Sequence, residues 1–320
     1  MLSPLGEVRP SGAGLCICMH FVFTNCFWYE IHICDLVFQE ANAAAPTAVF
    51  LSVLRLILRM QSEAVFLRKL LQDAGTRLRK QYGRVRTIRH KAGSVTNLVT
   101  NVDQEIEAFI KNRIRRQFPE DSILAEESEI EKADAKRRWI IDPLDGTTNF
   151  AHDLPIFSIS IGLEIDGKIA AGGVYNPVQE EFFFAMKGRG AAYNRKKIHV
   201  SKTRKLEQSL LVTGFPYDIH DHPERSLPYF NALIQRAQGI RRLGSAAIDL
   251  CYLAMGRFDG FFEVHLNPWD TAAGMLILLE AGGKITDFDG HPFSIYEPQL
   301  VASNGRIQQQ MLAVIQEVRG

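Results

Sequence analysis

The sequence predicts a layered α/β fold. The chain has 320 residues, 46% of them hydrophobic and 23% charged, which is an ordinary globular composition able to bury a sizeable core. Its middle part holds short runs in which apolar and polar residues alternate, as they do in half-buried antiparallel strands. Beyond residue 205, strand-like and helix-like runs follow one another, which favours helices packed on a sheet. This change of pattern predicts two domains, residues 60–205 and 206–320.

Residues 1–59 differ in composition from the rest and are expected to form an N-terminal extension outside the fold. Charged residues and histidines interrupt both apolar runs of this segment, so neither is typical of a membrane-spanning helix of about 20 apolar residues. A secretory signal is not indicated either, because no basic cluster adjoins the apolar run and no clean cleavage site follows. The cysteines there lack the usual zinc-finger spacing. We expect the natural protein to start at Met60.

Charge and cysteine usage bear on partners and location. The net charge of +1 gives no reason to expect nucleic acid or an anionic membrane as a partner. Four of the five cysteines lie in the first 34 residues, and Cys251 stands alone in an apolar run, which is typical of a small core residue. The main body therefore has no disulfide framework, and we expect a cytoplasmic protein.

Two amphipathic helices open the first predicted domain. Leucines and alanine recur at helical spacing between residues 67 and 82, which predicts a helix with one buried stripe. A second helix is expected between Thr100 and Pro119, where apolar residues repeat the same spacing. Thr100 and Asp103 have the form of a capping box, which by itself would explain Asp103.

Strands and helices follow in an order that fits layered packing. Asp166-Gly167 predicts a hairpin turn inside an antiparallel meander. The strand-like runs of the first half are 122–126, 139–142, 156–165, 168–175 and 180–186. The second half is predicted to contain strands at 210–214, 259–266 and 283–288, and helices at 227–237, 245–255 and 271–281.

The stretch WIIDPLDGTTNF (139–150) carries the strongest chemical signal. A buried-looking strand delivers Asp142 and Asp145, three residues apart, to a Gly-Thr-Thr turn. Two carboxylates this close can share divalent cations, and the carbonyl of Leu144 offers the hard oxygen ligand that Mg²⁺ prefers. The amides of the turn have the form of an anion nest suited to phosphate. These amides belong to Gly146, Thr147 and Thr148. The alternative is an ordinary Asp-Gly turn after a strand.

Further acids stand where they can join this pair. Glu126 and Glu127 follow another predicted strand, and Asp270 stands at the start of an apolar helix. Acids at the ends of neighbouring strands converge easily on one edge of a sheet. An N-cap role would account for Asp270 equally well, and one aspartate can fill both roles.

Three segments, AEES (125–128), WIIDPLDGTTNF (139–150) and EVHLNPWDTAAG (263–274), resemble in this order the signatures of the inositol monophosphatase family. The resemblance covers about residues 60–320 and is close to bacterial members. It implies an α-β-α-β-α sandwich, with an α+β N-terminal half, of the type shared with fructose-bisphosphatases. It also implies a lithium-sensitive, Mg²⁺-dependent hydrolysis of myo-inositol monophosphate to myo-inositol and phosphate.

The resemblance implies two or three Mg²⁺ ions per active site. One ion would be held by Glu126, Asp142 and the carbonyl of Leu144. A second would be held by Asp142, Asp145 and Asp270, so that Asp142 bridges the two. The ions would lower the pKa of water and stabilise the leaving alkoxide, so that no phospho-enzyme is required.

Catalytic roles also come from the resemblance. Thr147, hydrogen-bonded to Asp103, would orient the attacking water and help to deprotonate it. Glu127 would support the metal site from outside or hold a weaker third ion. Lys91 matches a family lysine near the metals, although by itself it reads as an ordinary exposed lysine.

The substrate-binding residues implied by the resemblance surround the same acids. Glu263 would bind ring hydroxyls of a polyol, and Arg241 with Gly244, Ser245 and Ala246 would form the wall that faces them. Taken without the resemblance, Ser245 is a typical helix N-cap and Arg241 a solvated charge. The set further includes Glu126, Leu144, Asp145, Gly146, Thr147, Thr148 and Asp270.

Other activities stay open. Relatives that act on fructose 1,6-bisphosphate or on the 3′-phosphate of adenosine 3′,5′-bisphosphate share the same constellation of acids. A different reading is an RNA or transcription-complex partner, since bacterial members are implicated in such complexes and residues 68–91 are strongly basic. A solvated helix face explains that charge as well. The family resemblance suggests a homodimer acting on a small phosphomonoester.

Overall fold

The computed structural model describes residues 46–84, 88–90 and 98–320. The chain divides into two units, Met1–Ser62 and Glu63–Gly320. Of the first unit, the structure describes the beginning of helix α3 (Pro46–Gln81), a helix that continues into the second unit. The cysteine-rich part of the expected extension, residues 1–45, lies outside the described residues. No helix among the described residues is long and apolar enough to cross a membrane.

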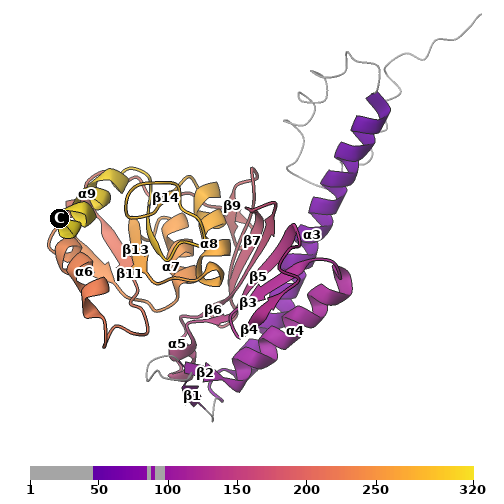
Figure 1. Ribbon diagram of the computed structural model, residues 1–320, viewed down its shortest axis with the longest axis horizontal. Coiled ribbons are helices and arrows are strands. Elements are labelled where there is room, and N and C mark those ends of the chain that lie inside the picture. Colours follow the sequence, from indigo (N-terminus) through magenta and orange to yellow (C-terminus); the bar gives the residue numbers. More distant parts are fainter. Residues whose placement is uncertain (1–45, 85–87, 91–97) are drawn as a thin grey trace, which may run out of the picture. The chain divides into compact units, whose positions relative to one another are not determined.

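The second unit contains an eight-stranded sheet in the order β10-β9-β8-β7-β6-β5-β3-β4 (Figure 1). Its pairs are antiparallel except for β3 and β5, which run parallel. Asp166 and Gly167, both with positive φ, form the predicted hairpin turn between β6 and β7. The strands are β3 (Ser122–Ala125), β4 (Ser128–Glu131), β5 (Arg137–Asp145), β6 (Ser158–Ile165), β7 (Lys168–Asn176), β8 (Glu181–Met186), β9 (Ala191–Tyr193) and β10 (Lys196–Lys197).

A second sheet has five strands in the order β12-β11-β13-β15-β14. Strands β12, β11 and β13 are parallel to one another, so their carboxyl ends meet at one edge. The strands are β11 (Leu210–Thr213), β12 (Gly239–Arg241), β13 (Gly260–Val264), β14 (Lys284–Thr286) and β15 (Gln299–Ser303). A separate pair, β1 (Ile88–His90) and β2 (Leu98–Thr100), is antiparallel.

Helices cover these sheets and lie between them. The described helices of the second unit, after α3, are α4 (Asn101–Gln117), α5 (Thr147–Ala151), α6 (Leu227–Ile234), α7 (Ala246–Ala254), α8 (Pro268–Glu280) and α9 (Gln308–Arg319). One apolar core joins α3 and α4 to the first sheet, a second joins α7 and α8 to both sheets, and a third joins α6 and α9 to the second sheet. This sequence of layers confirms the expected α-β-α-β-α sandwich.

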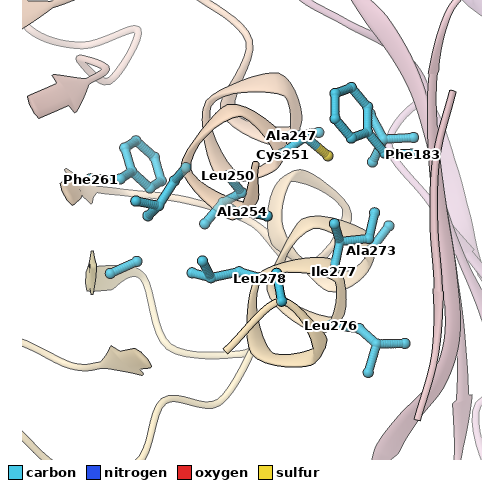
Figure 2. Packing of buried hydrophobic residues seen from close by; sticks show 14 of the residues in the cluster. Phe183, Ala247, Leu250, Cys251, Ala254, Phe261, Ala273, Leu276, Ile277 and Leu278 are labelled. Atoms are coloured by element: carbon cyan, nitrogen blue, oxygen red, sulfur yellow. The ribbon is translucent and has the colours of Figure 1, made fainter. Parts of the chain in front are cut away.

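The central helix layer shows how apolar burial fixes the two sheets (Figure 2). Leu250 of α7 packs against Gly274 of α8, while Phe183 of β8 and Phe261 of β13 lie on opposite sides of the helix layer. Cys251 is fully buried beside Phe183, as its apolar surroundings in the sequence predicted. Burying such side chains stabilises each by about 1.5–3 kcal/mol relative to exposure.

Glycines of the first sheet let helix α8 approach closely. A Cβ atom on Gly172 of β7 would lie 2.9 Å from the Cα atom of Ala273, and one on Gly162 of β6 would lie 3.0 Å from the Cβ atom of Ala272. No real Cβ atom tolerates the shorter of these contacts. The two glycines therefore set the distance between α8 and the sheet, and with it the height of the first turn of α8 above β5 and β6.

Candidate functional site

Acidic side chains gather where strands β3 and β5 end. The parallel pairing places Ala125 opposite Ile141, so the next residues, Glu126 and Asp142, follow side by side. The amide of Glu126 donates to the carbonyl of Ile141 at 3.2 Å and continues the ladder by one step. The sequence expectation that acids at strand ends converge is therefore met by these two residues.

A bulge in β5 presents the second aspartate. Asp142 pairs with Ser160 and Asp145 with Ser158, so Pro143 and Leu144 stand opposite the single residue Ile159 and β5 has one extra residue there. The amide of Leu144 donates to Oδ1 of Asp142 at 2.9 Å, which fixes that carboxylate. The irregular backbone thus turns two carboxylates and one carbonyl toward the same strand end.

Helix α7 holds the carboxylate of Asp145 through its N-terminus. The Ser245 hydroxyl donates to Oδ2 of Asp145 at 2.6 Å, and the amide of Ala247 donates to the same oxygen at 2.8 Å. Ser245 is also the N-cap of α7, since its oxygen accepts the amide of Ile248 at 3.4 Å. Ser245 therefore both caps α7 and contacts the site. The partial positive charge at the N-terminus of α7 also stabilises the carboxylate of Asp145.

Asp270 enters the site from the first turn of α8. It forms a capping box with Asn267, whose amide donates to Oδ2 of Asp270 at 2.7 Å. Close packing of α8 on Gly162 and Gly172 brings this turn to the end of β5. Ser160, the partner of Asp142 in the ladder, donates to the carbonyl of Trp269 at 3.4 Å.

The electrostatics show that these acids are crowded. Burial, followed by the charges of Glu126, Asp145 and Asp270, holds the pKa of Asp142 well above its usual range. Burial raises the pKa of Asp145 to about 6, although the Ser245 hydroxyl and nearby amides oppose the shift. Burial and the charge of Glu126 also raise the pKa of Asp270. In the absence of a cation, the neighbouring carboxylates thus raise the free energies of ionised Asp142 and ionised Asp270.

The donor set fits a hard divalent cation. Carboxylate and carbonyl oxygens are the ligands that Mg²⁺ takes, and the carbonyl of Leu144, which lies 3.0 Å from the Thr147 hydroxyl oxygen, has two lone pairs to offer. A cation would relieve the mutual repulsion that raises the pKa values of Asp142 and Asp270. Glu126 and Asp145 complete the expected ligand set around the same strand end.

Thr147 and Asp103 form the contact expected of them. The Thr147 hydroxyl lies 3.0 Å from Oδ1 of Asp103, and both side chains are buried. Asp103 reaches this position from the first turn of α4. Gly146 precedes α5 with φ 96°, and a Cβ atom there would lie 3.0 Å from the carbonyl of Ile156, so the turn requires glycine. No side chain among the described residues caps the first amides of α5, which include those of Thr147 and Thr148.

Glu263 joins the same site from the second sheet. Thr213 of β11 pairs with Phe262 of β13, so the next residues, Gly214 and Glu263, lie opposite each other. A Cβ atom on Gly214 would come within 2.1 Å of Oε1 of Glu263, so this carboxylate occupies the space that the glycine leaves. Burial and the charge of Asp270 raise the pKa of Glu263 to about 8.

The arginine near these acids is Arg242, which the sequence reasoning did not select. Its guanidinium lies next to Gly244, where a Cβ atom would meet Nη1 at 2.7 Å, and its charge lowers the pKa values of Asp145 and Glu263. Arg241 instead donates to the carbonyl of Ile240 at 3.1 Å, and both arginines are exposed. Successive residues on extended backbone point to opposite faces, so a shift of one position decides which arginine approaches the site.

Two further groups were missed for lack of a sequence signal. Tyr217 follows β11, and its pKa is raised by burial and by the charges of Glu126, Asp270 and Asp145. Asp249 is buried in α7, and within the described part of the chain its Oδ1 atom has no hydrogen-bond partner. Burial and the charge of Glu263 hold the pKa of Asp249 well above its usual range. Neither residue stands in a motif that marks it.

Other predicted residues have different surroundings. The amide of Glu127 donates to Oε2 of Glu107 at 2.9 Å. Ala246 adds a backbone contact that lowers the pKa of Asp145. Lys91 lies outside the described residues, as does the side chain of Thr100 in the expected capping box.

A separate group of potential ligands lies after β14. Asp287, Asp289 and His291 have ligand atoms within 4.8 Å of one another. Asp287 accepts the amides of Asp289 and His291 at 2.9 and 2.8 Å, and Asp289 pairs with Arg319 at 2.6 Å. These contacts within an exposed turn account for the grouping without a metal.

Comparison with known proteins shows what the chain is similar to. The model of the inositol monophosphatase family matches residues 59–319. The inositol-1-monophosphatase of Synechocystis sp. is 45% identical over 239 residues, which cover 74% of this chain and 83% of that protein. The Nus factor SuhB of Haemophilus influenzae is 41% identical over 250 residues, 78% of this chain and 94% of that protein. The crystal structure of extragenic suppressor protein suhB from Bartonella henselae has a TM-score of 0.76 and 36% identity, and covers 80% of this chain and 99% of that one.

Proposed function

The chain belongs to the inositol monophosphatase family, and we propose that it is a cytoplasmic, Mg²⁺-dependent phosphatase that hydrolyses myo-inositol monophosphate to myo-inositol and phosphate. The observation that carries the proposal is the crowding of Glu126, Asp142, Asp145 and Asp270, whose mutual repulsion calls for a bound cation. The name of the Synechocystis relative supports the substrate class.

The proposed ligands divide between two ions. Glu126, Asp142 and the Leu144 carbonyl hold the first, Asp142, Asp145 and Asp270 hold the second, and Glu127 supports a third. Bound Mg²⁺ supplies Lewis acidity that lowers the pKa of water toward neutrality and stabilises charge on the leaving alkoxide. Lithium sensitivity, carried over from the family, belongs to the same proposal.

The chain's own residues orient the reacting groups. The Thr147 hydroxyl donates a hydrogen bond to Asp103, as their 3.0 Å contact allows. The Thr147 oxygen then accepts a hydrogen bond from the attacking water. The amides of Thr147 and Thr148 donate to the phosphoryl oxygens. Water oxygen bonds to phosphorus as the bond from phosphorus to the alcohol oxygen breaks; the attacking water loses one proton to solvent, and the leaving alkoxide takes up one proton from solvent.

The alcohol half of the substrate meets the second sheet. Glu263 accepts hydrogen bonds from ring hydroxyls, and Arg242 supplies the positive charge assigned to Arg241 by the resemblance. Ser245 and Ala246 act through Asp145, since the Ser245 hydroxyl already donates to that carboxylate.

A substrate panel tests the proposal. Phosphate release from inositol monophosphate, fructose 1,6-bisphosphate and adenosine 3′,5′-bisphosphate is measured with and without Mg²⁺ and Li⁺. We expect the highest kcat/KM for inositol monophosphate, no turnover in a chelator, and inhibition by Li⁺. Turnover that persists without any divalent cation would refute the metal site, and a preference for either bisphosphate would refute the substrate assignment.

A role in a transcription complex is the second candidate, favoured by the relatives named Nus factor SuhB. The described part of the basic segment lends it little support. Lys69 pairs with Asp73, and Arg79 pairs with Glu180 at 2.6 Å. Salt-sensitive RNA binding that survives the Asp142→Asn substitution would support this role, and sedimentation in the same buffers tests the proposed homodimer.

A further inference from the structure

The metal ligand Glu126 stands on a very short turn. Ala125 of β3 pairs with Ser128 of β4, so Glu126 and Glu127 alone form the link between these two strands. Strand β4 is the last strand of the first sheet, and no strand among the described residues pairs with its other side. The position of this turn therefore depends on contacts from outside the sheet.

Helix α4 supplies those contacts along one face. Asp103, Glu107 and Lys111 are spaced by four residues, so their side chains lie one above another on the same side of the helix. All three are buried, with exposed fractions of 0%, 4% and 7%. Charged side chains are rarely so buried unless they are paired, which indicates that this stripe has a specific function.

Each residue of the stripe contacts a different part of the site. Asp103 accepts the hydroxyl of Thr147. Glu107, one turn further on, accepts the amide of Glu127 at 2.9 Å, a charge-assisted hydrogen bond directly beside Glu126. Lys111, after another turn, donates to the hydroxyl of Ser128 at 2.6 Å. One helix face thus holds Thr147 and the two residues that follow Glu126 in the chain.

Ion pairs stabilise the stripe. Lys111 lies 2.7 Å from Glu131 and 3.7 Å from Glu107, and Arg115 contacts both carboxylate oxygens of Glu131. Lys111 therefore compensates the buried charge of Glu107 and ties the far end of β4 to the same helix. A surface cavity of about 290 Å³ borders Glu107, Lys111 and Glu127, so water can enter when one of these side chains is shortened.

We propose that Glu107 and Lys111 are positioning residues that hold the Glu126–Glu127 turn in place for metal binding. The inference rests on the proposed function, in which Glu126 is a ligand of the first Mg²⁺ ion. Outer contacts of this kind typically affect metal affinity by about 10–100-fold. The effect is expected on Mg²⁺ affinity rather than on chemistry, because neither residue contacts Asp142, Asp145 or Thr147 in the described structure.

The experiment compares Glu107→Ala, Glu107→Gln and Lys111→Met with the wild-type full-length chain. In Glu107→Ala, the Mg²⁺ concentration for half-maximal activity should rise about tenfold, while kcat at saturating Mg²⁺ changes much less. Glutamine keeps an oxygen that can accept the Glu127 amide, so Glu107→Gln should restore most of the affinity. Lys111→Met, which loses the contact with Ser128, should lie between them.

Glu181→Ala is the matched control. Glu181 is also 4% exposed and accepts hydrogen bonds from Tyr252 and Arg257, yet it lies on β8 and contacts no residue of the site. This variant should lose stability without a change in its Mg²⁺ requirement. If Mg²⁺ affinity falls only because stability falls, Glu181→Ala will lose affinity as Glu107→Ala does. That result would overturn the positioning role.

Hydrogen exchange gives a readout that needs neither metal nor activity. In metal-free protein, the amide of Glu127 should exchange about tenfold faster in Glu107→Ala, and at the wild-type rate in Glu181→Ala. Suppose that the wild type needs Mg²⁺. If Glu107→Ala then has the wild-type exchange rate at Glu127, or the wild-type Mg²⁺ requirement, the positioning role alone is overturned. A wild type that needs no Mg²⁺ overturns the proposed metal site and the positioning role with it.

Discussion

The Asp145→Asn substitution measures what it costs to bury one ionised carboxylate of the site in the absence of a cation. Burial raises the pKa of Asp145 from 3.8 to about 6, so the folded-state value lies above the unfolded-state value. Such a carboxyl costs no stability below pH 3.8, an increasing amount up to about pH 6, and a constant amount above it. The two values differ by about two pKa units, and each unit corresponds to about 1.4 kcal/mol, which gives about 3 kcal/mol at pH 8.

Asparagine removes this cost and keeps the local contacts. Its side-chain oxygen can still accept the Ser245 hydroxyl and the Ala247 amide that now bind Oδ2 of Asp145. Metal-free Asp145→Asn should therefore exceed the wild type in free energy of unfolding by about 3 kcal/mol at pH 8, and by about half of that at pH 5. Urea denaturation in a chelator at both pH values measures the difference. Saturating Mg²⁺ should reverse the order, because the wild type binds the ion more tightly.

Asp259→Asn is the control. Asp259 is as buried as Asp145 and also accepts one hydroxyl and one amide, from Ser201 and Leu210. It stands just before β13 and contacts the start of β11, at the end of these strands away from the site. Its substitution should give no gain. If metal-free Asp145→Asn is no more stable than the wild type at pH 8, or if its gain does not grow from pH 5 to pH 8, the burial cost assigned to the Asp145 carboxylate is wrong.

Three further predictions concern the metal site and the core. Asp142→Asn removes a charge from both proposed coordination spheres, so phosphate release should become negligible at every Mg²⁺ concentration, whereas Asp270→Asn should mainly raise the concentration required; wild-type turnover in Asp142→Asn would contradict the bridging role. Gly172→Ala places a methyl group 2.9 Å from the Cα atom of Ala273, which should lower the free energy of unfolding by about 1–3 kcal/mol and, by moving α8, raise the Mg²⁺ requirement. Gly239→Ala, where the nearest contact is 3.4 Å, should change neither quantity in the same denaturation and titration series. Cys251→Ala should cost about 1 kcal/mol of stability with turnover nearly unchanged, and a hundredfold loss of kcat in a folded variant would mean that a thiol takes part.

Local sequence determined most of the helices and strands. The apolar stripe of residues 67–82 became the buried face of α3, and the run before Pro119 became α4, which ends at Gln117. Most strands that the pattern missed are short or lie at sheet edges, such as β10 and β12, but it also missed β15, which has five residues and lies between β13 and β14. Two or three residues hold too few side chains for an alternation to be recognised.

The sequence by itself determined the acids at the turn after β5, because Asp142 and Asp145 are neighbours in the chain and a strand followed by Pro and Gly leaves few local conformations. Only the tertiary structure decided what surrounds them. Parallel pairing set Glu126 beside Asp142, and close packing of α8 on glycines of the first sheet brought in Asp270. The choice of Arg242 over Arg241 depends on a one-residue register, which composition and spacing do not specify. Glu107 and Lys111 of α4 could not be selected for a related reason, because the sequence does not show that the β3–β4 turn lies against them.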